Sequence, residues 1–117
     1  MPITRLQGAR WHHRAGAGAS RPALLLVHCA GGSAGVHEPL VRQLEAAGSW
    51  RVVTVDLPGH GRSDPLEPPP PAAGLLDAYR EGLAALSERL GLGRHVVVGH
   101  SMGAAVAVEL ALAHPDR

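Results

Sequence analysis

The sequence lacks lysine, asparagine and phenylalanine, and its 117 residues include one cysteine, Cys29. Its eleven basic residues are all arginine, and ten acidic residues balance them. No run of these could follow a phosphate backbone, so we expect no nucleic-acid partner. One cysteine cannot form an internal disulfide, so nothing indicates the stapled core of a secreted domain.

Long apolar runs are also missing from the sequence. No run approaches the about 18 residues of a membrane span, and the first residues lack the apolar stretch of a signal peptide. We therefore expect no membrane association and a cytoplasmic location. No histidine or cysteine spacing is typical of zinc, and no metal or organic cofactor is expected.

What is present is the composition of one globular domain, with 45% hydrophobic and 18% charged residues. Residues 3–6 and 9–14 predict two short strands around a turn at Gln7-Gly8, and 15–22 predict a flexible connector. We therefore divide a single domain, 1–117, into an N-terminal hairpin with its connector, 1–22, and a core, 23–117.

The core predicts three strands, each followed by a helix. Continuous apolar runs bounded by glycine and proline indicate buried strands, and apolar residues at helical spacing indicate the helices. The expected strands are 24–28, 51–55 and 95–98, and the expected helices are 36–47, 73–90 and 104–113. This order predicts an α/β fold with a mostly parallel sheet and right-handed crossovers.

Residues 99–103 read Gly-His-Ser-Met-Gly and match the pattern G-x-S-x-G at a strand-to-helix turn. Such a turn holds a serine exposed above the sheet, where a base can activate its weakly nucleophilic hydroxyl. Gly99 and Gly103 are expected where strand and helix backbones approach closely. The alternative is that Ser101 only caps the helix that follows.

Three segments carry a family resemblance: LLLVHCAGG, VVTVDLPGHGRSD and VVVGHSMGAAVAVELALAHPDR. In this order and spacing the chain resembles the N-terminal portion of the α/β-hydrolase family. The resemblance implies that Ser101 is the nucleophile and that the amides of Met102 and Ala30 form the oxyanion hole. Family members have glycine where this chain has Cys29, whose thiol is either reactive or a small buried group.

The acid and the base of a catalytic triad follow the nucleophile in this family. After Ser101 the carboxylates and imidazoles are those of Glu109, His114 and Asp116, on or just beyond a helix that leads away from the site. We therefore expect no triad acid or base in this chain. Five other histidines are expected to be neither a catalytic base nor metal ligands: His12, His13, His28, His60 and His100.

The resemblance also implies that strand 24–28 lies between the other two and that later strands of the family sheet are missing. Strand 95–98 would then be a bare edge, open to pairing with another chain. The leading hypothesis is a serine hydrolase that, in full-length form, cleaves an ester- or amide-type small molecule through an acyl-enzyme. This chain alone would be nearly inactive.

Two other classes of function stay open. The first is a truncated, non-catalytic remnant or an interaction subunit that pairs through the bare edge. The second is nucleotide binding, although the glycines at 31, 32 and 35 do not have the G-x-G-x-x-G spacing. The substrate and the oligomeric state do not follow from the sequence, nor does the origin of the chain as a truncation, a gene fragment or half of an assembly.

Overall fold

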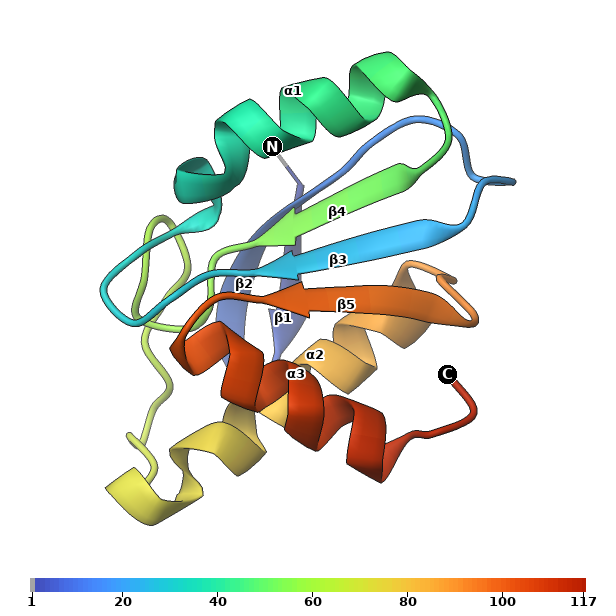
Figure 1. The fold of residues 1–117 in the computed structure, drawn as a ribbon. Helices are drawn as coiled ribbons and strands as arrows, with labels where there is room; N and C mark the ends of the chain where they lie inside the picture. The colour runs from blue at the N-terminus through green and yellow to red at the C-terminus, as the bar shows by residue number, and fades with distance from the viewer. Residues whose placement is uncertain (1) are drawn as a thin grey trace.

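A five-stranded mixed sheet of order β1-β2-β4-β3-β5 organises residues 2–117, which the computed structural model describes (Figure 1). Strands β1 and β2 form an antiparallel hairpin, and β2 joins it antiparallel to β4. Strand β3 lies between β4 and β5 and is parallel to both, which confirms the predicted fold class. The strands are β1 (Ile3–Leu6), β2 (Ala9–Ala15), β3 (Ala23–Val27), β4 (Arg51–Val55) and β5 (His95–Gly99).

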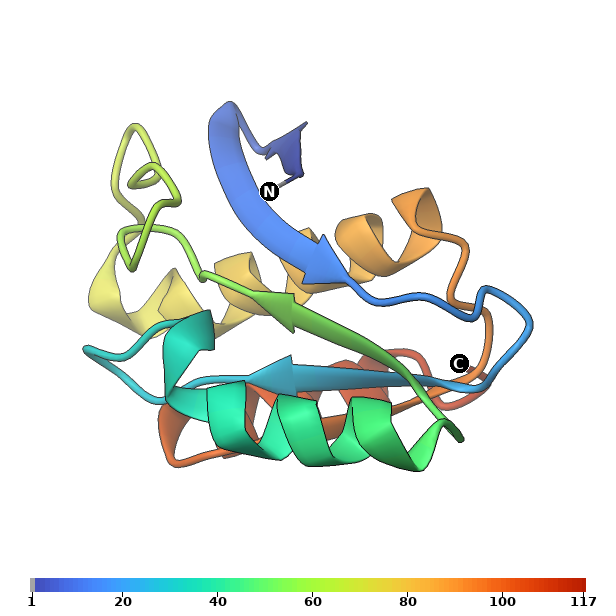
Figure 2. The same cartoon turned by 90° about the horizontal axis from the view of Figure 1, so that it is seen from above.

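Helices cover both faces of the sheet: α1 lies on one face, and α2 and α3 lie on the other (Figures 1 and 2). Short 3-10 turns precede α1 and α2, so both α-helices begin two residues later than the periodicity predicted. Helix α3 begins two residues earlier than predicted, directly after Ser101. The helical segments are η1 (Ala34–His37), α1 (Glu38–Ala47), η2 (Ala72–Gly74), α2 (Leu75–Arg89) and α3 (Met102–Ala113).

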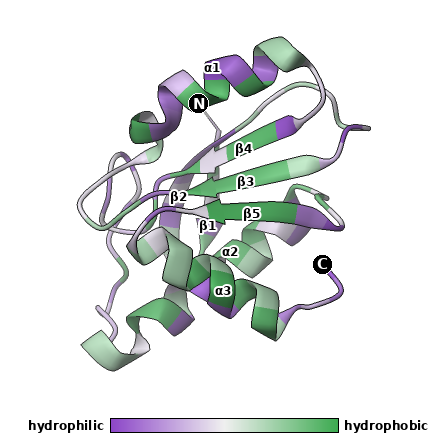
Figure 3. Cartoon of the chain, in the orientation of Figure 1, coloured by the Kyte–Doolittle hydropathy of each residue, from purple (hydrophilic) through white to green (hydrophobic). Residues whose placement is uncertain are grey.

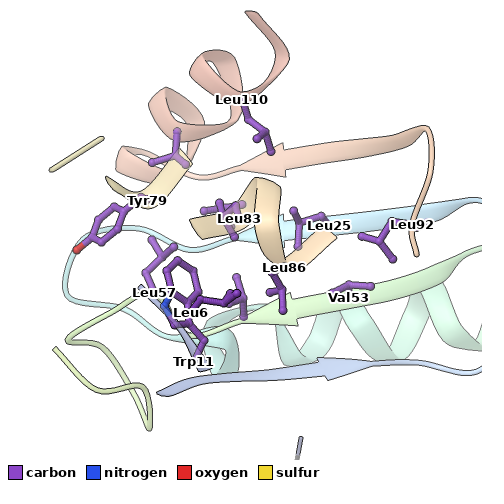
Figure 4. Packing of buried hydrophobic residues seen from close by; sticks show 14 of the residues in the cluster. Leu6, Trp11, Leu25, Val53, Leu57, Tyr79, Leu83, Leu86, Leu92 and Leu110 are labelled. Atoms are coloured by element: carbon purple, nitrogen blue, oxygen red, sulfur yellow. The ribbon is translucent and has the colours of Figure 1, made fainter. Parts of the chain in front are cut away.

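The larger of two apolar clusters lies between the sheet and helices α2 and α3 (Figure 4). Trp11 of β2 is fully buried there, and a Cβ added at Gly82 of α2 would collide with its ring. A smaller cluster packs strand residues Leu24, Leu26 and Val52 against Val41 of α1. The strands β3 and β4 are therefore buried on both faces, which explains their continuous apolar sequences.

Strand β5 forms one edge of the sheet and, within residues 2–117, pairs with β3 alone. Its apolar centre is visible in Figure 3. Val97 packs against the core, whereas Val96 and Val98 are 46% and 40% exposed. The expected apolar edge is thus present in the described part of the chain. No helix of residues 2–117 combines the length and apolar character needed to cross a bilayer.

Candidate active site

Ser101 occupies the turn between the end of β5 and the start of α3. Its backbone has φ 56° and ψ −116°, a conformation that costs free energy for any residue other than glycine. The residue is exposed, and its side chain makes no capping hydrogen bond to α3. Helix capping therefore does not account for this serine, and the strained turn presents its hydroxyl to solvent.

The glycines on either side of Ser101 lie where three backbone segments meet. A Cβ at Gly99 would collide with the carbonyl group of Gly103. A Cβ at Gly103 would lie 2.6 Å from the carbonyl oxygen of His28 and closer still to that of Val27. Because every obstacle is backbone, a side chain at either position would separate α3 from the ends of β3 and β5.

The backbone amides near this turn differ in whether they have a protein acceptor. Within residues 2–117, the N-H groups of Ala30 and Met102 donate to no protein atom. The amides that follow them are occupied: Gly31 donates to His60, Gly32 to the Cys29 carbonyl, Gly103 to the His100 carbonyl and Ala104 to the Ser101 carbonyl. Free amides, one of them at a helix N-terminus, are the groups that can stabilise an oxyanion.

His28, at the end of β3, is fully buried and has both ring nitrogens engaged. Its Nε2 accepts a hydrogen bond from the Leu57 amide at 3.0 Å, and its Nδ1 lies 2.7 Å from the Cys29 carbonyl oxygen. Burial lowers the pKa of His28 despite the opposing effect of that carbonyl. The neutral ring therefore joins β3 to the loop after β4. Cys29 itself is half-buried, with a free thiol.

Asp56, directly after β4, connects the loop after β3 to the loop after β4 and to β2 through its carboxylate. Its carboxylate accepts hydrogen bonds from the amides of Ala34 at 2.7 Å and Arg62 at 3.1 Å, and His12 Nδ1 lies 3.2 Å away. Burial opposes the charge, but these three donors outweigh it and the pKa of Asp56 is lowered. These contacts show that Asp56 holds together the region around the candidate site.

The side chains that follow Ser101 lie away from it. Glu109 is 3.8 Å from Arg80, and His114 Nδ1 is 3.4 Å from Arg117. His114 follows the last turn of the 12-residue α3, so it lies about 20 Å along the helix axis from Ser101, at about 1.5 Å per residue. None of Glu109, His114 and the exposed Asp116 reaches the hydroxyl.

The remaining histidines lie apart from one another or have different contact partners. His12 and His13 face opposite sides of β2, toward Asp56 and toward Thr4. His100 is exposed beside Ser101. His37 was not singled out by the sequence; burial lowers its pKa, as does the nearby His100. No group of three potential ligands in residues 2–117 could hold a metal ion.

Comparison with known proteins gives a consistent picture. The family model described as alpha/beta hydrolase fold matches residues 22–117. The chain is 34% identical over 117 residues to "Putative carbamate hydrolase RutD" of Caulobacter vibrioides, covering 100% of this chain and 42% of that protein. Over 66 residues it is 48% identical to "Lipase LipV" of Mycobacterium tuberculosis, covering 56% of this chain and 23% of the lipase.

Solved structures show the same fold. A carboxylesterase of Nitrososphaera gargenis superposes with a TM-score of 0.87 at 24% identity, covering 99% of this chain and 42% of that one. The enol-lactonase of Burkholderia xenovorans LB400 superposes with a TM-score of 0.85 at 26% identity, covering 99% and 43%. The chain thus spans less than half the length of each of these relatives.

Proposed function

Because the chain belongs to the α/β-hydrolase family, we propose that Ser101 is the nucleophile of a serine hydrolase that cleaves an ester- or amide-type small molecule. The observation that carries this proposal is the pairing of an exposed, backbone-strained Ser101 with two free amides, those of Ala30 and Met102. Ser101 Oγ attacks the substrate carbonyl carbon, and the carbonyl oxygen becomes an oxyanion that the two amides stabilise. The leaving group departs with a proton, and water then hydrolyses the acyl-enzyme.

The general base and its carboxylate partner come from outside residues 2–117 in this proposal. His114 contacts Arg117, and Glu109 lies beside Arg80, so neither side chain is at Ser101. Without a base, catalysis of about 10³-fold to 10⁴-fold over water can still arise from an oxyanion hole and substrate binding. We therefore expect Ser101 to react slowly with an activated electrophile in this chain, and its rate to rise with hydroxide concentration.

A fluorophosphonate probe tests this expectation. The Ser101 Oγ-P bond forms as the P-F bond breaks, releasing fluoride, and water or hydroxide takes the proton. Ser20 and Ser49 are exposed serines in the same chain and serve as internal controls. We expect Ser101 to be labelled about 10²-fold faster than either, the size of effect that one oxyanion donor supplies. Peptide mass spectrometry measures the ratio, and Ser101→Ala removes the signal. Equal labelling of all three serines in a folded sample would contradict the proposal.

A second candidate function is an interaction subunit that pairs through the edge of β5 with another polypeptide. The His95 amide on β5 already donates to the Arg117 carbonyl at 2.7 Å. The edge of β5 can therefore form hydrogen bonds with the backbone of another segment. Val96 and Val98, which follow His95, stay exposed. We propose a parallel strand from a separate chain as the partner.

Light scattering after size-exclusion chromatography tests the edge. We expect concentration-dependent association that a Val96→Arg/Val98→Arg double variant abolishes. Val108→Arg, which changes an exposed valine of α3, should leave association unchanged. A wild-type chain that stays monomeric up to about 10⁻³ M, where affinity corresponds to about 4 kcal/mol, would reject pairing between copies of this chain through this edge.

A further inference from the structure

His60, in the loop after β4, faces the turn after β3, and both of its ring nitrogens make hydrogen-bond contacts. Its Nε2 accepts a hydrogen bond from the Gly31 amide at 3.1 Å, and its Nδ1 lies 3.1 Å from the Pro58 carbonyl oxygen. An acceptor nitrogen carries no proton, whereas a nitrogen facing a carbonyl must carry one. These contacts therefore specify the neutral ring protonated at Nδ1.

His28 follows the same pattern beside it. Its Nε2 accepts from Leu57 and its Nδ1 donates to the Cys29 carbonyl, and its ring centroid is 4.9 Å from that of His60. The Cys29 carbonyl also accepts from the Gly32 amide at 3.0 Å. Two neutral imidazoles therefore connect the turn 28–32 to the loop 56–60.

These contacts determine how the Ala30 amide is aimed. The Cys29 carbonyl and the Ala30 N-H belong to one planar trans peptide unit and point in opposite directions. Because His28 and Gly32 hold the carbonyl, the N-H is directed away from them, and it has no protein acceptor within residues 2–117. His60 holds the next amide, that of Gly31, whose φ of 74° suits glycine.

We propose that His60 is a positioning residue for the oxyanion hole, and that with His28 it clamps the turn so that the Ala30 amide stays free and correctly aimed. This inference rests on the proposed role of Ala30. His60 touches no substrate in this scheme. It acts by keeping an unprotonated Nε2 against the Gly31 amide.

Three substitutions at His60 separate the clamp from a general contribution to folding. In Gln the amide group stands near the position of Nε2 and its oxygen can accept from Gly31. In Asn the amide group stands near Nδ1 and cannot reach Gly31. Leu provides neither group. We expect His60→Gln to keep the Ser101-to-Ser49 labelling ratio within about threefold, and His60→Asn and His60→Leu to lower it by about tenfold to 10²-fold, as a misplaced donor does.

A direct measurement on the wild-type chain does not depend on reactivity. In ¹⁵N-labelled protein, an N-H···N hydrogen bond gives a scalar coupling between the Gly31 amide nitrogen and His60 Nε2. We expect this coupling, together with an Nδ1-H tautomer for both His28 and His60. Absence of the coupling, or wild-type selectivity in folded His60→Asn, would overturn the clamp. Unselective labelling of the wild type would instead remove the proposed function, while the coupling still decides the clamp.

Discussion

Replacing Gly103 with alanine adds one carbon where α3 crosses the end of β3. That carbon would lie 2.6 Å from the His28 carbonyl oxygen and closer to that of Val27, against an ordinary carbon-oxygen contact of about 3.3 Å. Both oxygens belong to the backbone, so no side-chain rotation can relieve the overlap. The helix must instead move outward by about an ångström. Overpacking usually costs about 1–3 kcal/mol, and we expect the free-energy cost of this shift to lie at the upper end of that range.

The helix preference of alanine partly offsets this loss of stability. Alanine is favoured over glycine within helices by up to about 1 kcal/mol. We therefore expect Gly103→Ala to lower the free energy of unfolding by about 2–3 kcal/mol, which corresponds to a fall in melting temperature of about 10 °C or more for a domain of this size. The outward shift also moves the Met102 amide, so labelling of Ser101 should slow.

Urea denaturation followed by circular dichroism measures the loss of stability. Gly74→Ala is the matched control, because its Cβ would meet only ring carbons of Pro71, at 3.6 Å. We expect this control to change stability by less than about 0.5 kcal/mol. A Gly103→Ala variant as stable as Gly74→Ala would refute the close approach as the reason for the second glycine of the turn.

Three further predictions concern stability. Asp56→Ala should lower the free energy of unfolding by about 3 kcal/mol or more, because one buried and two part-buried donors lose their acceptor, and Asp56→Asn should cost less. Equal stability of Asp56→Ala and the wild type in urea denaturation would contradict this. Burial lowers the pKa of His13, His28 and His37 in the folded chain, so the unfolded chain takes up protons first as the pH falls below 6.5. The free energy of unfolding should therefore decline from pH 6.5 down to the folded-state pKa values. Urea midpoints that do not change between pH 7.5 and pH 5 would contradict this prediction. Gly82→Ala should lower the melting temperature although alanine favours helix, because the new Cβ collides with the indole ring of Trp11. In a Trp11→Leu background the ring is gone, so adding Gly82→Ala should no longer lower the melting temperature. Additive effects of the two substitutions would exclude this coupling between the two positions.

The local sequence predicted the elements of the core well, for identifiable reasons. Strands β3 and β4 are continuous apolar runs because they are buried on both faces. Helix α1 ends where Gly48 adopts φ 76°, a stop that glycine encodes directly. The predicted start of α3 is two residues late, because the motif at 99–103 predicts a complete turn, whereas Met102 and Gly103 already belong to the helix.

The sequence by itself determined the strand and helix segments of the core and the turn that carries Ser101, because these depend on patterns within short segments. Only the tertiary structure decided which amides are free and which are occupied. The acceptors of Gly31 and Ala34 are His60 and Asp56, which lie 29 and 22 residues away along the chain. Such contacts depend on where two loops meet after the sheet has formed, and no local pattern specifies that meeting point.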